Sequence, residues 1–161
     1  MDKNELRASL RAMRRGLTDR PARSEMIWDQ IEADPAVVDA AVIMVFDSIP
    51  GEPETAPFIA RRRAAGQTVV IPEDDPPPDP RQVDVVIVPG VGFTPDGDRL
   101  GQGGGWYDRF LAQLRPGTPT IGVCFAEQLQ TTLPTEPHDV RVDRVVTDVV
   151  PHGEGIDQIS G

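Results

Sequence analysis

VDVVIVPGVGFTPDGDRLGQGGGWYDRFL occupies residues 83–111, and this stretch decides the fold. Its first part, 83–90, is a mostly apolar run of the kind found in strands that are buried on both faces of a parallel sheet. A glycine-rich stretch (92–105) follows, and apolar residues then recur three to four positions apart over 106–114, which predicts a helix. A buried strand, a glycine-rich connection and a helix in this order predict a unit of parallel α/β structure.

The residues before this stretch predict three helices and two strands. Asp2 and Glu5 are spaced as a capping box, which indicates that the first helix begins there. Asp34 and Pro35 indicate a loop after the second helix. The run AAVIMVF (40–46) is apolar on both faces and is typical of a central strand. The predicted helices cover residues 2–15, 21–32 and 55–65, and the predicted strands cover 40–46 and 68–72.

The residues after the opening stretch complete the pattern. We expect a fourth strand over 118–125, a short helix with a loop over 126–140, and a shorter strand at the sheet margin over 141–150. The acidic, proline-rich segment 73–82 predicts an extended connection. The alternation of strands and helices predicts a single domain over residues 1–161, with an open, mainly parallel α/β sheet that carries helices on both faces.

The composition excludes several classes of protein. Acidic residues outnumber basic ones by 26 to 16, and this net charge of −10 repels polyanions and disfavours general binding of nucleic acid. No apolar run approaches the roughly 20 residues of a membrane span, and the charged N-terminus lacks the apolar core of a signal peptide. The single cysteine, Cys124, lies in a predicted strand, where we expect a buried packing residue. A cytoplasmic location is therefore expected.

The glycine-rich stretch is a candidate phosphate site. Gly101 and residues 103–105 lie between a buried strand and a helix, where backbone amides can bind phosphate oxygens. A flexible turn is the alternative, because the stretch lacks the lysine and serine or threonine of a P-loop, and Trp106 replaces the third glycine of a dinucleotide fingerprint. Asp108, in the first helical turn, is a candidate magnesium ligand or else a favourable charge at a helix start.

Ligands of parallel sheets collect beyond the carboxyl ends of the strands. The loops to inspect begin at Asp47, Pro89 and Phe125. In the first loop a carboxylate from Glu52 or Glu54 can accept hydrogen bonds from the ring NH and amino groups of a heterocycle. The alternative is a simple lead-in to the next helix, with Glu54 or Thr55 as its cap.

Two further groups of polar residues have open interpretations. Lys3, Arg7 and Arg14 form a stripe on the first helix that can hold a triphosphate, or else a solvated basic face. His138 and Asp139 are adjacent, but no partner completes a hydrolase triad or a metal cluster, since His152 is the only other histidine. We interpret His138 and Asp139 as loop structure.

Four segments, taken in order, carry a resemblance to a known family. They are KNELR (3–7), AVIMVFDSIPGEPET (41–55), the opening stretch 83–111 and TIGVCFAEQLQTTLPTEPHDVRVDRVVTD (120–148). With these motifs the chain resembles the 5-formyltetrahydrofolate cyclo-ligases, also called methenyltetrahydrofolate synthetases. The resemblance implies an open, Rossmann-like three-layer α/β fold of the CoA-transferase-like type. It also implies ATP- and magnesium-dependent ring closure of 5-formyltetrahydrofolate to 5,10-methenyltetrahydrofolate, with release of ADP and phosphate.

The resemblance assigns residues to this reaction. Lys3 and Arg7 would hold the ATP phosphates, and Asp108 would bind magnesium and take part in catalysis with Arg99 and Tyr107. The nucleotide would be wrapped by Arg99, Leu100, Gly101, Gln102, Gly103, Gly104, Gly105, Trp106 and Tyr107. The reduced folate would contact Phe46, Asp47, Glu52 and Tyr107. The chain is expected to act as a monomer.

One segment departs from the family pattern. Between the second and third predicted strands the family usually carries a long insertion that helps to form the folate pocket, whereas this chain has only EDDPPPDPRQ (73–82). Two alternatives therefore stand beside the cyclo-ligase. The chain is a paralogue that acts on another heterocycle, as in thiamine-related salvage, or a non-catalytic nucleotide-binding module.

Overall fold

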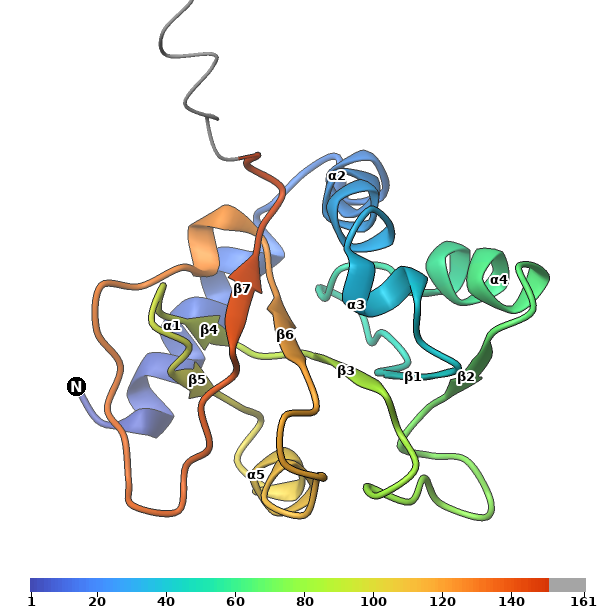
Figure 1. The fold of residues 1–161 in the computed structure, drawn as a ribbon. Helices are drawn as coiled ribbons and strands as arrows, with labels where there is room; N and C mark the ends of the chain where they lie inside the picture. Colours follow the sequence, from blue (N-terminus) through green and yellow to red (C-terminus); the bar gives the residue numbers. More distant parts are fainter. Residues whose placement is uncertain (151–161) are drawn as a thin grey trace, which may run out of the picture.

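The computed structural model describes residues 1–150, which build a five-stranded sheet with the strand order β2-β1-β3-β6-β7 (Figure 1). Every neighbouring pair of strands in this sheet is parallel. The strands are β1 (Val42–Val45), β2 (Thr68–Val70), β3 (Val85–Val88), β6 (Thr120–Val123) and β7 (Arg144–Val146). The prediction of an open parallel sheet with the last strand at its margin is confirmed.

Helices cover both faces of the sheet. Three of them, α2 (Arg20–Glu32), α3 (Pro35–Val38) and α4 (Ala56–Ala64), lie on one side, and α5 (Trp106–Leu111) lies on the other (Figure 1). Successive residues of a strand point to opposite faces. In β1, Ile43 therefore belongs to the core that contains Trp28 of α2, whereas Met44 belongs to the core that contains Phe110 of α5. The predicted three-layer arrangement is confirmed.

The helix α1 (Lys3–Arg15) stands beside the sheet and packs on the glycine-rich stretch. Its predicted capping box is present, with Asp2 and Glu5 each accepting a hydrogen bond from the other's backbone N–H. Leu10 of α1 is buried in a small cluster with Val91 and Leu100. Through this cluster α1 lies over the chain that leaves β3.

Two features of the fold differ from the sequence prediction. Asp34 was expected to mark a loop, but its side chain accepts a hydrogen bond from the Ala36 amide and begins α3. The glycine-rich stretch contains a two-stranded antiparallel sheet formed by β4 (Gly92–Phe93) and β5 (Arg99–Leu100). Phe93 of β4 packs on Gly122 of β6, where an added Cβ would lie 2.4 Å from the ring. A long-range contact of this kind has no local signal in the sequence.

The remaining differences concern element ends. Helix α5 ends at Leu111, three residues before the predicted end. The short helix predicted within 126–140 is present as a 3-10 helix over Ala126–Gln128. The segment 73–82 contains neither helix nor strand, as predicted.

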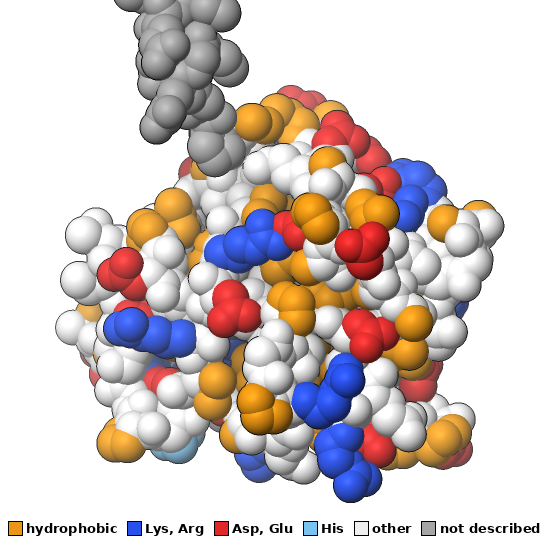
Figure 2. Space-filling view, viewed as in Figure 1, with side chains coloured by type: hydrophobic (Ala, Val, Ile, Leu, Met, Phe, Trp, Pro, Cys, Tyr) orange, Lys and Arg blue, Asp and Glu red, His pale blue; other side chains and the backbone are white. Residues whose placement is uncertain are grey.

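None of the helices in the described part of the chain is long and apolar enough to cross a membrane. Acidic and basic side chains are interspersed on the face seen in Figure 2.

Candidate functional site

A cavity of about 950 Å³ opens at the carboxyl ends of the central strands. Its walls come from the residues after β1, β2, β3 and β6, together with the first turns of α1 and α5. This position agrees with the rule for parallel sheets. The predicted site residues that line it are Lys3, Arg7, Phe46, Asp47, Glu52, Arg99, Gly101, Gln102, Gly103, Gly105, Trp106, Tyr107 and Asp108.

Several predicted site residues do not line the cavity. Leu100 is 1% exposed, and its side chain packs under the loop with Leu10. Gly104 faces open space, because nothing lies within 4 Å of a Cβ placed on it. Arg14 does not line the cavity either, since it is buried at the far end of α1.

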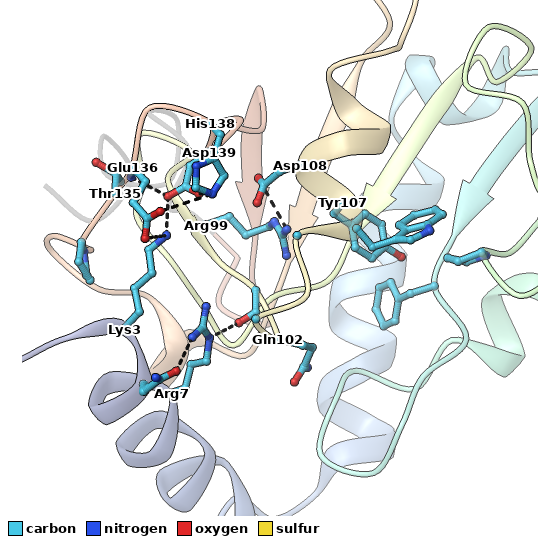
Figure 3. Close-up of a pocket in the computed structure, with 18 of the residues that line it drawn as sticks. Lys3, Arg7, Arg99, Gln102, Tyr107, Asp108, Thr135, Glu136, His138 and Asp139 are labelled. Atoms are coloured by element: carbon cyan, nitrogen blue, oxygen red, sulfur yellow. Dashed lines mark hydrogen bonds and ion pairs between the residues drawn. The ribbon is translucent and has the colours of Figure 1, made fainter.

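Basic side chains from α1 lie along one wall of the cavity. Lys3 Nζ donates a hydrogen bond of 2.8 Å to Asp139 Oδ2 and lies 3.3 Å from Glu136 Oε1 (Figure 3). Arg7 Nε donates to the carbonyl of Gly101 at 2.8 Å, which joins α1 to the glycine-rich loop. The predicted stripe therefore divides: Lys3 and Arg7 face the cavity, whereas Arg14 does not.

Arg99 is the most buried cation of the cavity, with a side chain only 5% exposed. Its Nη1 donates to the carbonyl of Pro89 at 3.1 Å, and its guanidinium lies over the Tyr107 ring, 5.3 Å from the centroid. Burial lowers the pKa of Arg99, and the charge of Asp108 opposes this effect. Because Nε has no hydrogen-bond partner among the described residues, Arg99 keeps an unsatisfied donor in the wall of the site.

Asp108 and Tyr107 occupy the start of α5, next to Arg99. Asp108 Oδ1 accepts a hydrogen bond of 3.1 Å from the Val140 amide and lies 3.9 Å from Arg99 Nη2. The Tyr107 hydroxyl is buried and lacks a hydrogen-bond partner within residues 1–150. Burial raises the pKa of Tyr107, so the hydroxyl is neutral and can donate a proton to a hydrogen bond.

The glycine-rich loop bends through backbone conformations that favour glycine. Gly103 has φ +113° and Gly105, which precedes α5, has φ +70°. Residues with side chains rarely adopt these values. Helix α5 has six residues, so its dipole is small and the loop amides are the main partial charges for an anion here.

The opposite end of the cavity is acidic. Glu52 is 6% exposed, and its Oε1 accepts a hydrogen bond of 2.9 Å from the Ile49 amide. Burial raises the pKa of Glu52, against the effects of the Ile49 amide and the charge of Arg14. Glu54 is held away by its backbone, which bonds Ser24 and Trp28, and it does not line the cavity. Of the two loop carboxylates, the geometry favours Glu52.

The helix lead-in interpretation of this loop holds in part. Thr55 precedes α4 but gives it no side-chain cap; its Oγ1 instead accepts a hydrogen bond of 3.0 Å from the Ser48 amide. Thr55 therefore closes the loop that carries Glu52.

Cys124 is fully buried, as predicted, and burial raises its pKa to about 12.

The loop before β7 also forms part of the cavity wall, which its sequence did not predict. Pro134, Thr135, Glu136, His138 and Asp139 line the cavity, although His138 and Asp139 had been interpreted as loop structure. Burial disfavours the charged form of Asp139, but its hydrogen bonds from Lys3 and the Glu136 amide outweigh that, so its pKa is lowered. Lys3 is the only lysine of the chain. Because a half-buried lysine needs an acidic partner, Lys3 was a sequence signal for an acidic loop beside it. His152 lies outside the described residues.

No three metal-ligating side chains come together within residues 1–150. A magnesium ion at Asp108 would therefore require oxygen ligands from a bound phosphate and from water. Both contacts of the Asp108 carboxylate noted above are made by Oδ1, which leaves Oδ2 directed to neither Val140 nor Arg99. The residues present fit a phosphate-bound magnesium ion better than a metal held by protein alone.

Comparisons with known proteins give the relationships of the chain. The sequence model of the 5-formyltetrahydrofolate cyclo-ligase family matches residues 74–148. The 5-formyltetrahydrofolate cyclo-ligase of Escherichia coli is 31% identical over 176 residues, with 86% of this chain and 96% of the relative covered. That of Mycoplasma pneumoniae is 41% identical over 70 residues, which are 44% of this chain and 42% of the relative.

A solved structure extends the comparison to the fold. The 5,10-methenyltetrahydrofolate synthetase of Mycoplasma pneumoniae superposes with a TM-score of 0.81 at 28% identity, over 92% of this chain and 100% of that chain. The sheet, the cavity and this superposition define an α/β protein with the methenyltetrahydrofolate synthetase fold.

The sequence match to the Escherichia coli relative runs through nearly its whole length, and the chain therefore belongs to the 5-formyltetrahydrofolate cyclo-ligase family. The sequence match to the Mycoplasma pneumoniae relative, by contrast, spans less than half of that relative's length, at 42%.

Proposed function

We propose that the protein is a 5-formyltetrahydrofolate cyclo-ligase, an ATP- and magnesium-dependent ligase that forms 5,10-methenyltetrahydrofolate, ADP and phosphate. One observation carries the proposal: a single cavity gathers the cations Lys3, Arg7 and Arg99 at one end, called here the cationic end although Asp108, Glu136 and Asp139 also line it, and has the buried carboxylate of Glu52 at its acidic end. A polyphosphate with a metal ion and a heterocycle with NH donors are the two ligands that these groups suit. Family membership supports the same pair of substrates.

ATP fits the cationic end. The Arg99 guanidinium lies largely buried in the cavity wall, and a phosphate would supply this cation with a charge-assisted hydrogen bond. Lys3 and Arg7 supply two more cations, and the loop residues Gly101, Gln102, Gly103 and Gly105 line the same space. We assign the nucleotide to residues 99–107, as the family resemblance implied.

Magnesium fits beside Asp108, where the carboxylate and the phosphates of ATP would share it. When bound, the ion neutralises phosphate charge and holds the terminal phosphate in place. Asp108 is itself kept in position by the Val140 amide and by Arg99. The fixed carboxylate is what this chain contributes to the metal site.

The reduced folate fits the acidic end. Glu52 keeps its backbone hydrogen bond on Oε1, so the other oxygen is available to the ring NH or amino group of the pterin. Phe46 and Asp47 follow β1 beside it, and the unpartnered Tyr107 hydroxyl lies between the two ends. We assign to Tyr107 a hydrogen bond with the folate near the reacting formyl group.

The reaction needs the two substrates to meet near Arg99 and Tyr107. The formyl oxygen attacks the γ-phosphorus of ATP, and the bond from that phosphorus to ADP breaks. The neighbouring folate nitrogen then bonds to the formyl carbon and loses its proton, and the C–O bond breaks as phosphate leaves and takes up that proton. Phosphoryl transfer depends on positioning and on charge neutralisation, and Lys3, Arg7 and Arg99 supply both.

The short segment 73–82 is compatible with this activity. Pro72 and Glu73, at its start, line the cavity, so the connection contributes to the wall. The 70-residue match is 44% of this chain and 42% of the Mycoplasma pneumoniae relative, which makes the two chains nearly equal in length. A solved methenyltetrahydrofolate synthetase of that length supports folate as the substrate.

A spectrophotometric assay tests the proposal. Purified protein with 5-formyltetrahydrofolate, ATP and magnesium should show growing methenyl-folate absorbance, and Asp108→Asn should reduce the rate by about 100-fold or more. Asparagine keeps the oxygen that accepts from Val140, so the variant should remain folded. Normal ATP binding without turnover would contradict the proposal and favour another heterocycle or a nucleotide-binding module.

A single domain, a monomeric state and a cytoplasmic location remain predictions.

A further inference from the structure

We propose that Arg14 is a positioning residue for the acidic end of the cavity, where its buried guanidinium packs against the loop that carries Glu52 and favours the ionised form of the Glu52 carboxylate. The proposal rests on the proposed function, because it assigns a reason for the charge with which Glu52 would accept hydrogen bonds from the folate. Arg14 itself does not line the cavity. It would act only through Glu52.

The burial of Arg14 is unusual for a cation. It belongs to the last turn of α1, yet it is only 6% exposed, whereas its neighbour Arg15 is exposed. Its Nη1 is buried without a hydrogen-bond partner among the described residues. A buried cation is costly unless an opposite charge compensates it, so its surroundings must supply that compensation.

The loop that carries Glu52 packs directly against the Arg14 guanidinium. A Cβ placed on Gly51 would lie 2.9 Å from Arg14 Nε and 3.5 Å from Cζ. Gly51 also has φ +96°, which a residue with a side chain rarely adopts. Glycine at this position therefore permits the close approach of the loop to the guanidinium, and Glu52 is the next residue.

Among the charges around Glu52, Arg14 supplies the positive one, although the two side chains form no ion pair within 4.0 Å. Asp47 after β1 and Glu73 after β2 are negative and disfavour ionisation of Glu52, and Arg14 from α1 is positive. Tyr107 from α5 also faces this group as a neutral phenol. With burial and two carboxylates acting against the charged form, the Arg14 cation is the charged group that favours it.

The arrangement gives α1 a part in both ends of the cavity. Lys3 and Arg7 occupy its first two turns at the cationic end, and Arg14 lies in its last turn beside the Glu52 loop. The same helix thus carries the cations for the proposed phosphate site and the positive charge near the proposed pterin anchor. Arg14 contacts neither substrate.

The test compares Arg14→Met with Arg15→Met, which removes an equal charge from an adjacent exposed position. Replacement of a buried charge by an apolar side chain of similar length is often tolerated, and thermal melting with ATP binding would verify folding. Carbon-13 NMR of the glutamate carboxyls, assigned with Glu52→Gln, measures the titration of Glu52 in each protein. Arg14→Lys, which restores the positive charge, is the rescue variant.

We expect the Glu52 titration to move to higher pH in Arg14→Met, to stay in place in Arg15→Met and to return towards wild type in Arg14→Lys. The KM for 5-formyltetrahydrofolate in Arg14→Met should rise about tenfold at the acid end of the activity range and little at pH 8, since a neighbouring charge changes the ionised fraction of a carboxyl by about that factor. The KM for ATP should stay the same.

The inference would be overturned by an unchanged Glu52 titration in folded Arg14→Met, or by a loss of folate affinity that is equal at all pH values. Failure of the proposed function has a different signature, because wild type itself would then produce no methenyl-folate. In that case the NMR titration still decides whether Arg14 sets the charge of Glu52.

Discussion

Lys3 and Asp139 are 136 residues apart in the sequence and are joined by a hydrogen bond of 2.8 Å across the mouth of the cavity. The pair ties the first turn of α1 to the loop before β7, so two segments without regular contact in the sheet form one wall of the site. Their side chains are 19% and 13% exposed, which keeps the pair near water.

The first prediction concerns Lys3. Lys3→Met should raise the KM for ATP about tenfold or more, because one cation is lost from the proposed phosphate site. The free energy of unfolding should fall by only about 0.5–1 kcal/mol, since ion pairs near water contribute little. Steady-state kinetics and urea denaturation measure the two effects, with Arg15→Met as the control for net charge. A large loss of stability with an unchanged KM would show that Lys3 serves the fold alone.

The second prediction uses two adjacent glycines. Gly103→Ala should lower the free energy of unfolding by about 1–2 kcal/mol, because alanine is strained at φ +113°. Gly104→Ala should leave it nearly unchanged, since its Cβ would enter open space. Denaturant titration of both variants measures the difference. Equal stabilities would mean that the loop does not hold the described conformation in solution.

The third prediction concerns the cost of the buried carboxylate. Burial raises the pKa of Glu52 in the folded protein, so the folded state retains a proton that the unfolded chain loses near pH 4.3, and stability falls as the pH rises through this window. Glu52→Gln should therefore be more stable than wild type at pH 7 and equally stable at pH 3. Its KM for the folate should rise.

Thermal denaturation at the two pH values measures this effect. A Glu52→Gln variant that is less stable than wild type at pH 7 would contradict the assignment of Glu52 as a group that costs folding free energy for the sake of binding. Asp47→Asn is a suitable comparison, because Asp47 also lines the cavity but is exposed.

The fourth prediction concerns the thiol. Cys124 is fully buried, and burial raises its pKa to about 12, so almost no thiolate exists at pH 8. Ellman's reagent should react with the native protein only at the rate of unfolding and should react at once in concentrated urea. Rapid reaction of the native protein would indicate that β6 opens locally.

The sequence predicted the parallel sheet because the strands 40–46 and 83–90 are continuous apolar runs, a pattern set by burial of both faces. It also predicted Lys3, Glu52 and Asp108 as site residues, from local motifs and from the family resemblance. Local patterns could not place Asp139, because its role depends on a contact with Lys3 made only in the folded chain. The β4 and β5 pair was missed for the same reason, since Phe93 finds its place on Gly122 of another strand.

Helix α1 runs without interruption from Lys3 to Arg15, and each residue of an α-helix adds about 1.5 Å and 100° of rotation. The eleven-residue separation of Lys3 and Arg14 therefore fixes about 16 Å between them along the axis. One residue inserted after Arg7 would turn Arg14 away from Gly51 while Lys3 and Arg7 kept their places. The spacing of charges along α1 thus couples the two proposed sites, and an insertion there would alter the Glu52 end of the cavity while leaving the proposed phosphate site in place.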